Sequence, residues 1–79
     1  MPFYIIIWDE DNIKHLDDHG VTQDEFEEVV SVPDSIGESR STGLPLAFGY
    51  TSTGKYLVCV YEQIDEVTVY PVTAYEADE

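Results

Sequence analysis

A chain of 79 residues, 43% of them hydrophobic, is long enough to fold as one small domain and too short for a second. Seventeen acidic residues against three basic ones give a net charge of −14, which argues against unaided binding to nucleic acid because such binding relies on Lys and Arg at the phosphates. We therefore expect a single domain over residues 1–79 whose field attracts a basic protein partner, with a homo-oligomer left open. High acidity also has a simpler explanation, which is solubility.

Cysteine use and hydropathy restrict the compartment and the chemistry. Cys59 is the only cysteine, so neither an internal disulfide nor a thiolate zinc site is possible, and its apolar surroundings predict a buried, inert thiol. No apolar run approaches roughly 18 residues and no cationic leader is present. We expect a cytoplasmic protein with no membrane contact and no cofactor.

The first elements are a strand and a short helix. Residues 3–8 form a compact run of aromatic and branched side chains, which predicts a central strand. Asp9 or Asp11 then caps a helix of two or three turns that ends near Asp18.

A sharp corner leads into the second helix. Gly20 suits the left-handed conformation that ends a helix, and Thr22 and Glu25 have the spacing of a capping box. The second helix is predicted over residues 23–31. Residues 33–44 begin with a proline, are rich in Ser and Gly, and are predicted to form one long flexible loop.

The remainder of the chain has the alternation of β-strands. Residues 46–50 and 55–62 flank a turn at 51–54, and the second of these strands is apolar enough to be buried on both faces. A last strand is predicted over residues 67–74, where Pro71 requires an edge or a bulge. The predicted fold is α+β: a strand, two helices and a three-stranded antiparallel meander, with the helices packed on one face of the sheet.

Five short motifs occur in this order of elements. They are Trp8-Asp9-Glu10, His19-Gly20-Val21, Gly49-Tyr50-Thr51, Gly54-Lys55-Tyr56-Leu57-Val58 and Val72-Thr73-Ala74. Together they resemble the BrnT-type toxins of type II toxin–antitoxin modules, which share their fold with the RelE and ParE toxins. The resemblance covers nearly the whole chain, and it implies a ribonuclease that a partner antitoxin neutralises.

Basic residues that the resemblance leads us to expect are replaced in this chain. Asp18 stands where the family usually has a lysine, Leu44 where an arginine leads into the hairpin, and residues 75–78 where the family has an arginine-rich segment. Metal-free RNA cleavage needs cations at the phosphate. Two functions follow: a divergent BrnT-like protein-binding module with little or no ribonuclease activity, or an active metal-independent ribonuclease toxin neutralised by an antitoxin.

The candidate catalytic residues are His19, Lys55 and Arg40. Lys55 matches a basic position of the family hairpin, although a solvated turn lysine is the simpler interpretation, and His19 either transfers protons or merely closes its helix. Asp11, His15 and His19 have helical spacing that is only weakly typical of a metal site, so no metal is expected.

Candidate partner-binding residues lie on the predicted helices. The acidic residues densest there are Asp17, Asp18, Glu25, Glu27 and Glu28. They are predicted to face water and to bind a basic protein or antitoxin. The tyrosines at 50, 56, 61, 70 and 75 suit base stacking, a partner interface or core packing.

Overall fold

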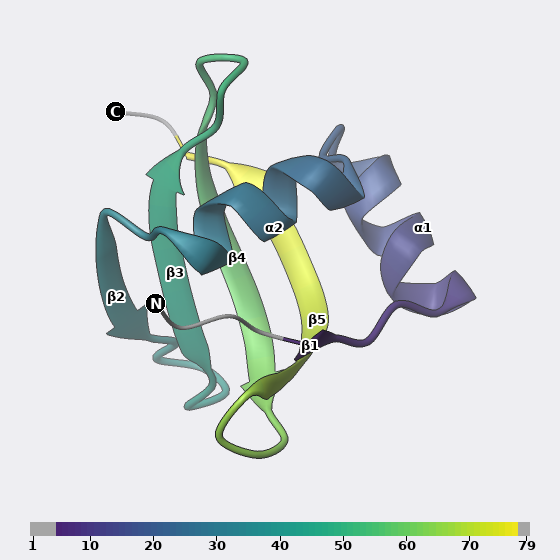
Figure 1. Ribbon diagram of the computed structural model, residues 1–79, viewed down its shortest axis with the longest axis vertical. Coiled ribbons are helices and arrows are strands. Elements are labelled where there is room, and N and C mark those ends of the chain that lie inside the picture. Colours follow the sequence, from purple (N-terminus) through teal and green to yellow (C-terminus); the bar gives the residue numbers. More distant parts are fainter. Residues whose placement is uncertain (1–4, 78–79) are drawn as a thin grey trace.

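Two helices and a five-stranded mixed sheet make up the computed structural model, which describes residues 5–77 (Figure 1). The sheet order is β1-β5-β4-β3-β2. In chain order the elements are β1 (Ile5–Ile6), α1 (Glu10–Asp18), α2 (Gln23–Ser31), β2 (Ser35–Glu38), β3 (Pro45–Tyr50), β4 (Tyr56–Gln63) and β5 (Thr68–Glu76).

The predicted α+β class is confirmed, and the sheet is larger than predicted. Strands β3, β4 and β5 form the expected antiparallel meander. β2 adds to this meander antiparallel to β3, and β1 adds parallel to β5. The prediction of a three-stranded meander therefore describes only the centre of the sheet.

The first strand lies at the edge of the sheet, and the prediction of a central strand over residues 3–8 was wrong. Only Ile5 and Ile6 pair with β5, and residues 3 and 4 of the predicted strand lie outside the described part. Ile7 still donates to the carbonyl of Val69 at 3.0 Å. The chain then turns at Asp9 to begin α1, which ends the extended segment on that side.

A strand also lies within residues 33–44, where the sequence predicted only a loop. β2 has the sequence Ser-Ile-Gly-Glu, whose polar composition conceals a strand that depends on pairing with β3. The actual loop is the tight connection after it, closed by Ser39 donating to the Leu44 carbonyl at 2.8 Å. Gly43 adopts a φ of 74° there, a conformation that favours glycine.

Both helices begin with a reciprocal capping box. Asp9 and Asn12 exchange hydrogen bonds of 2.9 Å at the start of α1, and Thr22 and Glu25 do the same for α2. Gly20 has a φ of 74° at the corner between the helices. The predicted corner and the bounds of α2 are confirmed.

The hydrophobic core lies between the helices and one face of the sheet. Both helices contribute to one cluster with β3, β4 and β5, and the rings of Trp8 and Phe26 form a T-shaped pair with centroids 5.5 Å apart. The core residues are Leu16, Val21, Phe26, Val29, Val30, Ala47, Leu57, Cys59, Tyr61, Val69 and Ala74. Neither of the helices among residues 5–77 is long and apolar enough to cross a membrane.

Pro71 lies beside an irregularity in the β4–β5 ladder, as the bulge alternative predicted. The register shifts between Val60 and Tyr61, so that Val60 faces Thr73 while Tyr61 faces Pro71. The extra residue on β5 is accommodated next to the proline, which has no N–H to donate.

Candidate functional site

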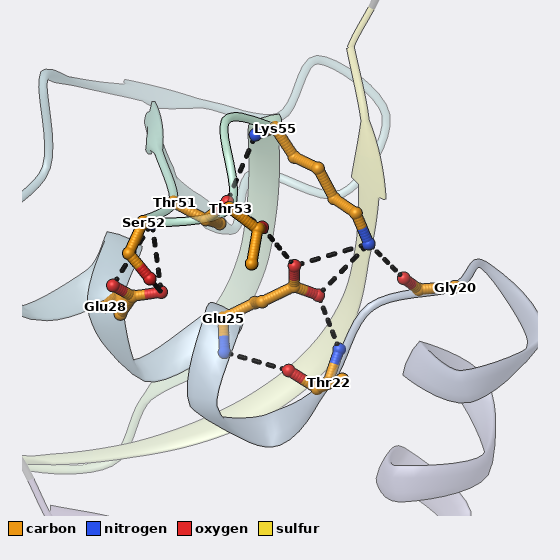
Figure 2. A network of polar contacts seen from close by, with 8 residues as sticks. All are labelled: Gly20, Thr22, Glu25, Glu28, Thr51, Ser52, Thr53 and Lys55. Carbon is orange, nitrogen blue, oxygen red and sulfur yellow. Dashed lines mark hydrogen bonds and ion pairs between the residues drawn. The ribbon is translucent and has the colours of Figure 1, made fainter.

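The Lys55 ammonium lies in a polar network that joins the α1–α2 corner to the β3–β4 turn (Figure 2). Its Nζ atom is 3.3 Å from each Glu25 carboxylate oxygen and 2.9 Å from the Gly20 carbonyl. Glu25 also accepts hydrogen bonds from the Thr53 hydroxyl at 2.8 Å and the Thr22 amide at 3.0 Å. The Lys55 side chain is 35% exposed, and its charge is paired with Glu25.

Glu25 faces inward, so the prediction that it faces water was wrong. Only 5% of its surface is exposed. Burial raises the pKa of the carboxyl, but the hydrogen bonds from Thr22, Thr53 and Lys55 together lower it below its ordinary value. Glu25 therefore has a structural role as the ion-pair partner of Lys55. Its carboxylate is covered by the domain and does not offer a surface charge to a partner.

The other predicted partner-binding acids divide into two groups. Glu27 accepts a hydrogen bond from Trp8 Nε1 at 2.9 Å, and Glu28 accepts from the amide and hydroxyl of Ser52. Asp17 and Asp18 are exposed, and within residues 5–77 their side chains make no hydrogen bond or ion pair. The donors to Glu27 and Glu28 are neutral, so all four carboxylates add to the negative field, but only Asp17 and Asp18 have no hydrogen bond to give up on docking within the described residues.

The three candidate catalytic residues lie at two different ends of the sheet. Arg40 is exposed in the connection before β3, whereas Lys55 follows the turn after β3. A six-residue strand spans about 20 Å, which separates Arg40 from Lys55 by more than one phosphate can bridge. His19 is exposed beside Gly20, at the Lys55 end, with its ring 6.4 Å from that of Tyr75.

Neither a metal centre nor an enclosed cavity is formed by residues 5–77. Asp11 and His15 lie in α1 and His19 is its C-cap, and the three do not converge into a group that could hold an ion. No pocket forms within the same range. Cys59 is buried, and burial raises the pKa of its thiol to about 12, so it is not a nucleophile at neutral pH.

In the described part of the chain, one face of the sheet carries no helix. Successive strand residues point to opposite faces, and a Cβ on Gly49 would lie 3.4 Å from Val29 of α2, which assigns Gly49 and Ala47 to the helix side. On the opposite side, a Cβ on Gly37 would lie 3.3 Å from the Phe48 ring.

We call this opposite surface the helix-free face, and it is apolar and aromatic. Cross-strand neighbours form rows, such as Phe48, Val58 and Tyr75. Tyr75 is 42% exposed, while Val58 on the central strand is buried. The apolar residues of the helix-free face are Leu46, Phe48, Tyr50, Tyr56, Val58, Val60 and Tyr75, and the ends of the same rows are Ser35, Gly37 and Thr73.

The predicted tyrosines divide between this face and the core. The rings of Tyr50 and Tyr56 are in contact, with centroids 4.7 Å apart, whereas Tyr61 belongs to the core. The alternation of Leu46, Phe48 and Tyr50 was visible in the sequence. The sequence did not indicate which of the two faces of the sheet the helices would cover.

Carboxylates border one end of the helix-free face. Tyr70 lies opposite Glu62 and donates its hydroxyl proton to Asp9 at 2.6 Å. This hydrogen bond raises the pKa of Tyr70. The negative charges of Asp9, Asp11 and Glu62 raise it further. The same hydrogen bond lowers the pKa of Asp9. This end of the face therefore favours a cation.

Comparison of the chain with family models, with curated proteins and with solved structures finds no match. The functional argument therefore depends on the surfaces and side chains described above.

Proposed function

We propose that this chain is a divergent BrnT-like component of a toxin–antitoxin module and acts as a protein-binding module for a basic partner. The observation that carries the proposal is the apolar helix-free face. The solvated face of an antiparallel sheet usually presents polar side chains, whereas the centre of this one presents aromatic and branched side chains. Tyr50 and Tyr75 are exposed, and Leu46, Phe48 and Tyr56 are half-buried. A partly exposed apolar surface of this kind is typical of a protein–protein interface.

The charge of the chain favours a basic protein as the occupant. A second copy carrying the same net charge of −14 would be repelled, whereas a basic partner would be attracted and would associate faster. The carboxylates around Tyr70 supply complementary charge at the border of the apolar face. Asp17 and Asp18 add to the long-range field from α1.

Little or no ribonuclease activity is part of the proposal. The ribonuclease alternative needs Lys14, Arg40 and Lys55 to converge with His19 as free cations at a phosphate. Lys55 is paired with Glu25, Arg40 lies at the other end of β3, and Lys14 is exposed within α1. His19 is accessible as a proton donor or acceptor, yet acid–base chemistry alone leaves the developing phosphate charge unstabilised.

A cleavage assay tests the enzymatic half of the proposal. The purified chain is incubated with labelled RNA, and the chain is expressed alone in a growing culture. We expect intact RNA and unimpaired growth. RNA cleavage that disappears in Lys55→Ala or His19→Ala would overturn this half and establish the ribonuclease alternative.

A binding titration tests the other half. The probe is the protein encoded by the adjacent gene, as expected for a toxin–antitoxin module, and affinity is measured across salt concentrations. We expect Tyr75→Lys to weaken binding roughly 30-fold, because it puts a flexible charged side chain in the place of an exposed aromatic ring of the face. The control, Asp17→Lys with Asp18→Lys, should change mainly the association rate and its salt dependence. An acidic partner, or full affinity in Tyr75→Lys, would contradict the proposal.

A further inference from the structure

β2 is the terminal strand of the sheet on the side of β3, and its outer edge is open (Figure 1). Ser35, Ile36 and Glu38 are all exposed, and Ile36 retains 64% of its surface. Within residues 5–77 no other strand pairs with this edge. Open edges present backbone donors and acceptors to any extended segment that approaches.

The register shows which backbone groups point outward. Ser39 donates its N–H toward β3, to the Leu44 carbonyl, so alternation directs the N–H groups of Ile36 and Glu38 away from β3. Pro45 lies opposite Glu38 and has no N–H, which suits a pair that exchanges no hydrogen bonds. The outer edge therefore offers the N–H and C=O groups of Ile36 and Glu38.

The side chains of β2 favour some kinds of added strand over others. Natural sheets often protect an open edge with Lys or Pro, and β2 contains neither. Instead, Asp34 and Glu38 flank the exposed Ile36. Two copies pairing through β2 would place these carboxylates near one another, with a net charge of −14 on each chain, so self-pairing is disfavoured. A basic strand would place its cations against them.

We infer that β2 accepts an extended basic segment of the partner as an added strand. The main chain of that segment pairs with Ile36 and Glu38, its Lys or Arg side chains pair with Asp34 and Glu38, and an apolar residue covers Ile36. This inference rests on the proposed function and specifies how part of the partner binds. Binding at β2 would use backbone hydrogen bonds, whereas binding at the helix-free face would use apolar side-chain contacts.

A random peptide library provides the probe. Peptides selected on the immobilised chain are synthesised with a fluorophore, and their affinities are measured by anisotropy. We expect selected sequences that alternate Lys or Arg with β-branched residues. Ile36→Pro removes an outward N–H while leaving the β3 pairing intact, and it should weaken binding about tenfold. The control Ile36→Thr keeps the N–H and should bind within about threefold of the unaltered chain.

Charge reversal at Glu38 supplies a second variant. Glu38→Lys should weaken the binding of the same peptides and reduce the salt dependence of that binding. This variant tests the inference by itself if thermal unfolding shows that Ile36→Pro does not fold. Acidic selected peptides, the absence of selected peptides, or equal affinity for Ile36→Pro and Ile36→Thr would overturn the inference. If the selected peptides bind Ile36→Pro normally but lose affinity for Tyr75→Lys, the proposed function stands and only the edge inference fails.

Discussion

Glu25 ties the first turn of α2 to the β3–β4 turn, because its oxygens accept hydrogen bonds from Thr22, Thr53 and Lys55 at once. The backbone N–H of Glu25 also donates a hydrogen bond to the Thr22 hydroxyl, at 3.1 Å. The Thr22–Glu25 spacing was sufficient to predict the capping box. The contact with Lys55 was not predictable, because it joins residues 30 positions apart that only the folded sheet brings together.

Replacement of this anion tests its contribution to stability. We expect Glu25→Gln to lower the free energy of unfolding at pH 7 by about 2 kcal/mol, since it leaves Lys55 without its counterion and weakens charge-assisted hydrogen bonds. Asp24→Asn, in the same helical turn but exposed, is the matched control and should change little. Urea denaturation measures both.

The pH dependence of that difference has a definite sign. The pKa of Glu25 lies lower in the folded state than its ordinary value of 4.5, so its contribution is present above pH 4.5 and is lost as the pH falls through the folded pKa. The unaltered chain and Glu25→Gln should therefore converge in stability as the pH falls from 4.5 through the folded pKa of Glu25. A difference that stays constant from pH 7 down to the acid unfolding of the chain would contradict this account of Glu25.

Elements with strong local signals were predictable, and elements that depend on distant pairing were not. The bounds of α2 followed from its capping box and apolar spacing, and the β3–β4 hairpin followed from alternation around Gly54. β2 is polar, and β1 is only two residues long. Both exist because a neighbouring strand offers hydrogen bonds, which is information absent from their own sequences.

The capping box at the start of α2 can be tested separately. We expect Thr22→Ala to lower the free energy of unfolding by about 1 kcal/mol, because the Glu25 amide loses its acceptor. Thr22→Ser retains the hydroxyl and should be nearly as stable as the unaltered chain. Equal losses in the two variants would show that the threonine methyl group, and not the cap, stabilises this corner.

Across the whole molecule, negative charge is only weakly neutralised from within. Among residues 5–77 the ion pair is that of Lys55 and Glu25, while the chain carries 17 acidic residues. We expect the thermal midpoint at neutral pH to rise from very low to moderate salt, because counterions screen this self-repulsion. Asp17→Lys with Asp18→Lys makes the net charge less negative and should reduce the rise. A midpoint that stays flat or falls would indicate stabilising ion binding instead.

Isotope-edited NMR of the chain with the product of the adjacent gene tests the central claim, that this is a binding module which docks a basic partner on its helix-free face. The methyl groups of Leu46, Val58 and Val60 and the ring of Tyr75 report on that face directly. We expect their signals to shift on complex formation, while the methyl groups of Leu16 and Val29 in the helix-side core change little. Shifts confined to α1 and α2, with the helix-free face unaffected, would contradict the account.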